Sequence, residues 1–165
     1  MRKYVVDTNV AIVANGRGIH GGAKAPSLAC RMAAVEFLQG LVQSGKFFLD
    51  VAGDIQAEYR RHLLPVGQPG VGDRFYLEVI NSNPAVVERV ILQRLENGEY
   101  QILPDLIIKS TFDPSDRKFA ALAIQTGSRV VNAVDSDWIH HRELLLNSGV
   151  KLKLLCGDCI DNWFE

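Results

Sequence analysis

Two acidic residues follow apolar runs in this chain, at points where a buried strand is expected to end. Asp7 follows the run "YVV" and precedes Thr8 and Asn9, and Asp135 follows the run "VVNAV". An acid in that place adds little to the stability of a core strand. In an open parallel sheet, ligands bind beyond the carboxyl ends of the strands. We therefore expect Asp7 and Asp135 to share one site.

Further acids are expected on helices near the same edge. In "TFDPSDRKFAALA", Asp113 and Pro114 fit the start of a helix, which fixes Asp116 in its first turn. Glu58 falls about one turn into the helix after the second strand, and Asp137 follows Asp135 by two positions. Simpler roles stay open, because Asp116 could stabilise a helix N-terminus and Glu58 could be a solvated acid in i,i+4 pairs.

Several carboxylates gathered at one edge would repel one another and raise their own pKa values unless a cation neutralised them. A ligand set made only of oxygens favours a hard ion such as Mg²⁺ or Mn²⁺. Such an ion can turn a bound water into a nucleophile and stabilise the charge that develops on a phosphodiester. The pattern therefore predicts hydrolysis of a nucleic-acid backbone.

The elements that would position these acids alternate between strands and helices. Strands are expected at residues 3–6, 46–51, 129–134 and 150–155, with 99–103 a further extended candidate, and helices at 25–41, 55–64, 73–80, 85–95, 113–125 and 136–146. This order predicts an α/β fold with a mainly parallel sheet. No repeat or linker divides the chain, so we expect one domain over residues 1–165.

Composition excludes several classes of protein. Apolar residues make up 47% and charged residues 22% of the 165 residues, which is typical of a globular domain. Lys and Arg number 18 against 19 Asp and Glu, so any site for a polyanion must be local. Neither a membrane span nor the apolar core of a signal peptide is visible, and we expect a cytoplasmic protein without a membrane partner.

Three cysteines are present, and two of them form the motif Cys156-Gly-Asp-Cys159. This spacing could bind zinc together with a second pair, or act as a redox dithiol. No second CxxC motif exists, and the motif lies at the C-terminus rather than near the start of a thioredoxin-like fold. We therefore expect Cys30, Cys156 and Cys159 to be reduced thiols without a role of their own.

These motifs together resemble those of the PIN-domain ribonucleases, the family that includes the VapC-type toxins of type II toxin–antitoxin systems. The resemblance covers nearly the whole chain: an apolar strand ending in Asp7-Thr8-Asn9, the helical acid Glu58, the stretch Asp116–Ala123, and Asp135-Ser136-Asp137-Trp138. It implies a three-layer α/β/α sandwich around a central parallel sheet. It also implies an endoribonuclease that uses Mg²⁺ or Mn²⁺ to cut RNA.

The resemblance assigns roles to individual residues. Asp7, Glu58, Asp116 and Asp135 match the family's acidic quartet, Asp137 matches an additional acid, and Thr8 and Asn9 match polar residues that help to hold the first acid. We expect Asp7 and Asp135 to bridge the tightest metal, Asp116 to hold it directly or through water, and Glu58 to orient water or a second metal. The expected partners are an RNA substrate, an antitoxin that covers the site, and a second copy of the chain.

Basic residues near the acids are candidate phosphate contacts. They are Arg17, Arg60, Arg117 and Lys118, although a solvated basic face is an equal alternative. Two loops depart from the family pattern. The glycine-rich segment 15–24, "NGRGIHGGAK", could contact phosphate through Arg17, His20 and Lys24 or be only a mobile surface loop, and the Pro/Gly-rich segment 65–72 could be a lid or a partner-contact loop.

Other classes of protein fit the motifs less well. A haloacid-dehalogenase phosphatase needs a second Asp two residues after the first, where this chain has Asn9, and a Thr two further on, where it has Ala11. A dinucleotide-binding Rossmann domain needs glycines directly after the first strand. A PIN-like module that binds RNA or protein without cutting remains the alternative, although clustered acids without a metal would be costly.

Overall fold

A five-stranded parallel sheet organises the computed structural model, which describes residues 1–17 and 24–165. The strands are β1 (Lys3–Val6), β2 (Lys46–Asp50), β3 (Val87–Val90), β4 (Arg129–Asn132) and β5 (Lys151–Leu154). They lie in the order β3-β2-β1-β4-β5, and each neighbouring pair is parallel. The predicted parallel α/β sheet is confirmed.

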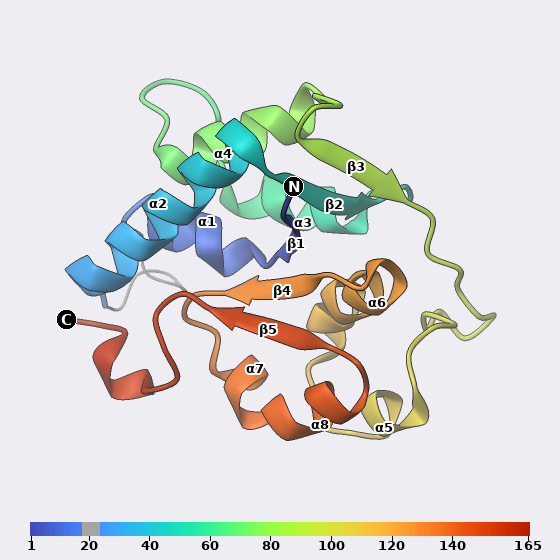
Figure 1. The fold of residues 1–165 in the computed structure, drawn as a ribbon. Coiled ribbons are helices and arrows are strands. Elements are labelled where there is room, and N and C mark those ends of the chain that lie inside the picture. Colours follow the sequence, from blue (N-terminus) through green and yellow to red (C-terminus); the bar gives the residue numbers. More distant parts are fainter. Residues whose placement is uncertain (18–23) are drawn as a thin grey trace.

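Helices cover both faces of this sheet. They are α1 (Thr8–Ala14), α2 (Leu28–Ser44), α3 (Asp54–His62), α4 (Val71–Ile80), α5 (Asp105–Ile108), α6 (Arg117–Thr126), α7 (Ser136–His140) and α8 (Arg142–Asn147), with short 3₁₀ turns η1 (Pro114–Asp116) and η2 (Ile160–Asn162). In Figure 1 the central strands lie between α2 on the left and α6 on the right, which is the expected three-layer sandwich. Among the described residues, none of the helices combines the length and apolar character that crossing a bilayer requires.

The central strands are apolar because helices bury both of their faces. Val5 and Val6 of β1 and Val130 and Val131 of β4 are all fully buried. A strand covered on both sides reads as a continuous apolar run rather than as an alternating pattern. The same burial makes the residue at which each run ends, such as Asp7, easy to recognise in the sequence.

The expected helix at residues 85–95 is wrong, because this segment contains the edge strand β3. Its apolar residues are spaced closely enough to satisfy a helical period. In the structure Val87 pairs with Phe47 and Val90 with Asp50 of β2, so tertiary pairing decides the conformation. Segment 99–103 is not a strand either, and only an isolated bridge joins Arg94 to Tyr100. Helix α1 was not predicted, and the expected helix 136–146 divides at His141 into α7 and α8.

The expectation of reduced thiols is wrong for two of the three cysteines. Cys30 at the start of α2 and Cys156 after β5 form a disulfide whose Cα atoms lie 4.9 Å apart, and Cys159 is free and exposed. The partners are 126 positions apart in the sequence, so no local spacing marks them as a pair. The C-terminal segment lies alongside, since Ser27 N–H donates to Trp163 O at 2.8 Å.

Candidate metal centre

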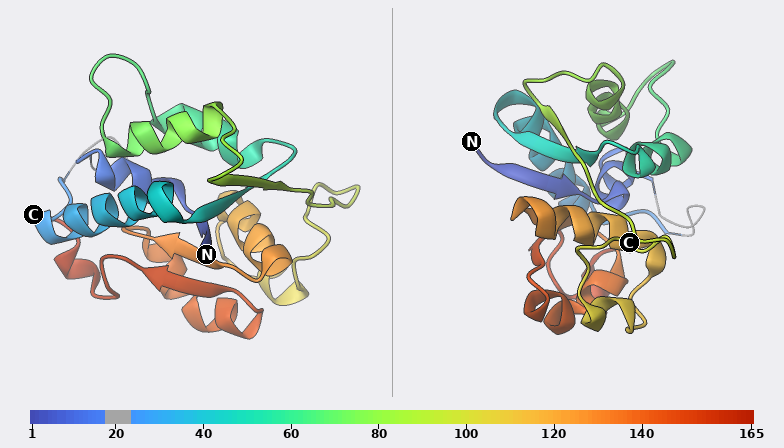
Figure 2. Two further views of the ribbon diagram at one scale, coloured as in Figure 1. Left: turned by 45° about the horizontal axis from the view of Figure 1, so that its top comes forward. Right: turned by 90° about the vertical axis from the view of Figure 1, so that its right-hand side faces the viewer.

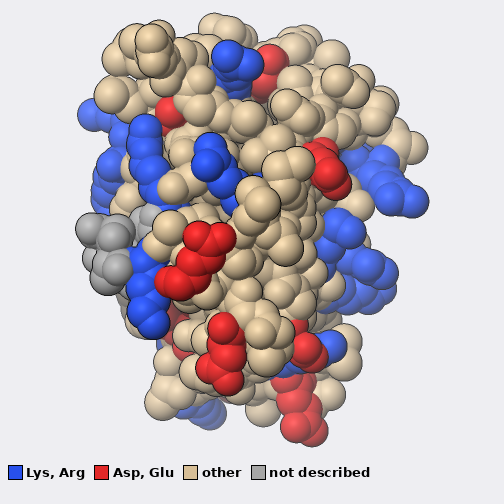
Figure 3. Space-filling model, turned by 90° about the vertical axis from the view of Figure 1, so that its left-hand side faces the viewer, with Lys and Arg blue, Asp and Glu red and all other residues tan. Residues whose placement is uncertain are grey.

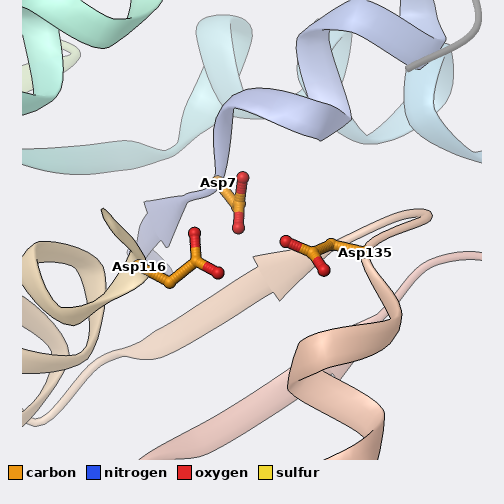
Figure 4. A group of neighbouring side chains, drawn as sticks. All are labelled: Asp7, Asp116 and Asp135. Carbon is orange, nitrogen blue, oxygen red and sulfur yellow. The ribbon is translucent and has the colours of Figure 1, made fainter. Parts of the chain in front are cut away.

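Three carboxylates converge at the carboxyl edge of the sheet. Asp7, Asp116 and Asp135 each present an oxygen atom, and these atoms all lie within 4.8 Å of one another. Figure 4 shows the three side chains pointing toward a common space from the end of β1, from the turn before α6 and from the loop after β4. The expectation that Asp7 and Asp135 would meet, with Asp116 beside them, agrees with this geometry.

Asp7 is fixed by two hydrogen bonds and is only 3% exposed. It caps α1, because its Oδ1 accepts from Asn9 N–H at 3.1 Å. Its Oδ2 accepts from the indole Nε1–H of Trp138 at 2.6 Å. Trp138 itself is fully buried and packs edge-on against Phe112. The donors hold the carboxylate in one orientation while leaving each oxygen a lone pair for another partner.

The other two acids are held by the starts of helices. Asp116 ends η1, directly before α6, and is 7% exposed. Asp113 caps η1 by accepting from Ser115 N–H at 2.9 Å, and Pro114 follows it as predicted. Asp135 caps α7, where its Oδ1 accepts from Asp137 N–H at 2.9 Å. Both acids therefore lie at helix N-termini, and the cap hydrogen bond orients Asp135.

Two asparagines join the loop of Asp135 to the helix that follows Asp7. Asn9 Nδ2 donates to Asn132 Oδ1 at 2.9 Å, and Asn9 Oδ1 accepts from the backbone N–H groups of Ala133 and Val134 at 2.8 and 3.0 Å. Asn132 Nδ2 donates to Asp135 O at 3.1 Å. The sequence suggested that Asn9 supports only Asp7, but in the structure it supports both Asp7 and the loop of Asp135. Asn132 and Trp138 were not predicted as site residues, and nothing local in the sequence marks them as partners.

The carboxyls of Asp7 and Asp116 hold protons unusually firmly. Burial, followed by the charges of Asp135 and Glu58, raises the pKa of Asp7 to about 7 despite the opposing hydrogen bonds. Burial, followed by the charges of Asp7 and Asp135, raises the pKa of Asp116 to about 9. Near neutral pH the group therefore carries fewer negative charges than three acids would in water. A divalent cation at this point would displace those protons and offset the repulsion.

Glu58 lies beside this group with partners of its own. Its Oε1 accepts from Thr8 Oγ1–H at 2.6 Å, and its Oε2 forms an ion pair with the ammonium of Lys118. Within the described ranges, the cluster whose oxygens lie within 4.8 Å includes Asp7, Asp116 and Asp135 but not Glu58. Thr8 therefore supports an acid, as expected, although that acid is Glu58. Lys118, expected to contact phosphate, neutralises Glu58 in this structure.

The remaining predicted site residues are placed less centrally. Asp137 accepts from Asp113 N–H at 2.9 Å and lies 3.0 Å from Nδ1 of His141, so its carboxylate turns away from the three acids. Arg117 is almost buried and bonds Glu99 Oε1 at 2.7 Å, which leaves little of it for phosphate. Other candidates are peripheral: Arg17 lies 3.7 Å from Asp73 Oδ2, and Arg60 is exposed on α3. His20 falls outside the described residues.

Comparisons with protein-family models, with curated proteins and with solved structures found no match to this chain. No relative therefore assigns a role to any residue of the acidic group. The functional interpretation depends on the geometry and electrostatics described above.

Proposed function

We propose that this protein is a metal-dependent endoribonuclease of the PIN type. The observation that carries the proposal is the convergence of carboxylate oxygens of Asp7, Asp116 and Asp135 within 4.8 Å, with burial that opposes the ionisation of Asp7 and Asp116. Buried acids kept together without a counter-charge reduce stability, and a bound cation would reverse that effect. Oxygen-only ligands favour Mg²⁺ or Mn²⁺ over softer metals.

Each residue has a distinct part in the proposed reaction. Asp7, Asp116 and Asp135 would hold the ion, and Trp138 fixes the orientation of Asp7. When bound, the ion would supply Lewis acidity to the reaction. Glu58, held by Thr8, would orient the attacking water. Asp137 has a supporting role, because it links the loop before η1 to α7 rather than facing the three acids.

A depression beside Glu58 is suited to receive the substrate strand. It has a volume of about 370 Å³, and its lining includes Glu58, Arg61, Arg94 and Lys118. Lys118 forms an ion pair with Glu58, so a phosphate that entered there would compete with Glu58 for the same ammonium. RNA is therefore the proposed substrate. We further propose that the chain is a toxin whose antitoxin covers this edge, and that it acts as a dimer in the cytoplasm.

The direct test is cleavage of a mixed-sequence single-stranded RNA by purified protein with Mn²⁺, Mg²⁺ or EDTA. We expect products with either metal and none with EDTA. Asp7→Asn should lower the rate by about a hundredfold or more, since it removes an interaction with developing charge. Asp105→Asn is the matched control, because Asp105 is exposed on α5 and 82% of its side-chain area is accessible.

Cleavage that persists in EDTA, or that Asp7→Asn leaves intact, would refute the proposal. A melting curve then tests the remaining alternative to the nuclease, a PIN-like module that binds RNA or protein without cutting. The absence of both cleavage and a metal-induced rise in melting temperature would favour that module.

A further inference from the structure

The amino edge of the sheet carries a row of basic residues. Four of the five strands begin with one: β1 with Lys3, β2 with Lys46, β4 with Arg129 and β5 with Lys151. The register places Lys3 beside Lys46 and Arg129 beside Lys151. We call this row, together with Arg2 and Lys153, the basic edge. The strand starts lie at the opposite end of the strands from the three acids, and Lys153, the third residue of β5, lines the same depression as Arg129.

The basic edge is hollowed and lacks acids within its main depression. That depression has a volume of about 630 Å³, and its charged lining consists of Arg2, Lys3, Arg129 and Lys153. The hydroxyl-bearing residues Thr126 and Ser128 complete the wall next to Arg129. In the right-hand view of Figure 2, β1 begins at the left, beside the N-terminus, and Figure 3 places this side at its right-hand margin, where Lys and Arg side chains gather.

Most of these cations lack a protein counter-ion. In the part of the chain that the structure describes, no carboxylate lies within ion-pair distance of Arg2, Arg129, Lys151 or Lys153. Lys3 and Lys46 share one carboxylate, Glu88, at 3.1 and 4.0 Å. Since the whole chain has a net charge of −1, this excess of positive charge is local.

Helix dipoles offset only part of the excess positive charge. The C-terminal ends of α2 and α6 lie at this edge, where Ser44 and Thr126 line depressions that also contain Arg2. Each helix end contributes roughly half a negative charge, so two helices offset about one of the six cations. Like charges on neighbouring strands also reduce stability. The surplus indicates an external anion.

We propose that the basic edge binds the phosphodiester backbone of RNA, as a second contact surface remote from the acids. Neighbouring strands lie ~4.8 Å apart, so the row from β2 to β5 spans about 15 Å. Phosphates lie ~3.4 Å apart along a strand of a duplex and farther apart along an extended single strand. About three phosphates of an extended strand can therefore face the row. The choice of RNA as the polyanion rests on the proposed function, whereas the site itself rests on the charges.

The test measures binding in the absence of cleavage. A fluorescently labelled single-stranded RNA is titrated with Asp7→Asn protein in EDTA, and anisotropy is recorded over a series of KCl concentrations. The variant Arg129→Glu/Lys153→Glu is compared with the matched control Arg74→Glu/Lys109→Glu, which makes the same change in charge at exposed sites on α4 and α5. Thermal melting verifies that each variant is folded. Arg129→Lys tests whether a positive charge at this position is enough for RNA binding.

We expect the slope of log K against log [KCl] to be about −2, from ~0.7 per phosphate contacted. The Arg129→Glu/Lys153→Glu variant should bind at least tenfold more weakly at low salt, with a slope shallower by about one, while the control and Arg129→Lys retain affinity. Equal loss in both charge-reversal variants would overturn the proposal. Preferential binding to phosphatidylserine vesicles, or equal competition by polyglutamate, would also overturn it.

The outcomes remain separable from those for the acid centre. A protein that binds RNA through the basic edge but never cuts it would refute the ribonuclease alone. A protein that cuts a short oligonucleotide normally when Arg129 and Lys153 are reversed, and binds long RNA as before, would refute the basic edge alone.

Discussion

The two edges of the sheet carry opposite charges in different environments. At the carboxyl edge Asp7 and Asp116 are nearly buried, and helix N-termini and side-chain donors fix the acids there. At the amino edge the bases are more accessible, with 44% of the Lys3 side chain exposed. Buried charge needs a compact counter-ion in a fixed place, whereas exposed charge acts over a distance and is screened by salt. The difference is the one that the proposed metal at one edge and the proposed polyanion at the other would require.

Part of this polarity follows from the α/β architecture itself. Helices that follow parallel strands begin at the carboxyl edge, where acids can cap them, and Asp50 does so for α3 by accepting from Asp54 N–H and Ile55 N–H at 2.8 and 3.0 Å. Asp50 is a structural cap without a place in the acid group. Capping therefore explains single acids, but it does not explain why three converge.

The largest expected effect is a fall in the stability of metal-free protein as pH rises. The folded-state pKa of Asp7 is raised from 3.8 to about 7, so between these values the folded protein retains a proton that the unfolded chain has lost. Asp116 extends this window to about pH 9. Between pH 5 and 9, Asp7 alone corresponds to a loss on the order of 3 kcal/mol, measured by urea unfolding in EDTA.

Asp116→Asn should flatten this pH profile, whereas Arg129→Glu/Lys153→Glu should leave its slope unchanged. A stability that rises with pH across the window would show that the acids are not held in their protonated form.

Metal should reverse the instability of the carboxyl edge. At a Mn²⁺ concentration one hundred times the dissociation constant, the free energy of unfolding should rise by about 2.7 kcal/mol, which corresponds to about 5–10 °C in melting temperature. Asp116→Asn should remove this gain while making the metal-free protein more stable, because a neutral amide avoids the cost of burying an ionisable carboxyl. Calorimetry with and without Mn²⁺ measures both the stabilisation by the metal and the stability of the metal-free variant. An equal stabilisation by Mn²⁺ in the variant and the parent would contradict a site at Asp116.

Trp138→Phe tests how far one hydrogen bond defines the centre. The change removes the donor to Asp7 Oδ2 but keeps an aromatic ring against Phe112. We expect about tenfold weaker Mn²⁺ binding and a loss of about 1–2 kcal/mol in stability. Trp163→Phe is the matched control, since its Nε1–H donates to Gly157 O instead of an acid. Isothermal titration calorimetry measures the Mn²⁺ affinity of both variants, and equal affinities would contradict the role of Trp138.

The smallest effect is expected at the amino edge. Lys151→Gln removes one of two like charges that the register places side by side, so stability at low salt should increase by about 0.2–0.5 kcal/mol. The gain should disappear in 1 M KCl because the Debye length falls to ~3 Å. Urea unfolding at the two salt concentrations measures it, and a loss of stability would mean that Lys151 has a stabilising contact.

The sequence was informative where residues act locally. Apolar runs located four strands, and the Asp113-Pro114 pair marked the start of the helix that carries Asp116. Prediction failed where distant contacts decide. Val87 joins a strand because β2 lies beside it, and Cys30 meets Cys156 across the fold. The bonds from Trp138 to Asp7 and from Asn9 to Asn132 likewise join residues that only the folded chain brings together.

The disulfide also divides the acid centre covalently. Cys30 and Cys156 close a ring that contains Asp116 and Asp135, whereas Asp7 lies on the segment before Cys30. A single peptide-bond cut after Arg17 would therefore release residues 1–17 from any covalent link to the ring. Strand β1 and helix α1 would then stay in place only through their packing and hydrogen bonds. The acid group can thus be treated as a split site, in which a short peptide bearing Asp7 would complete the three acids on a covalently closed body.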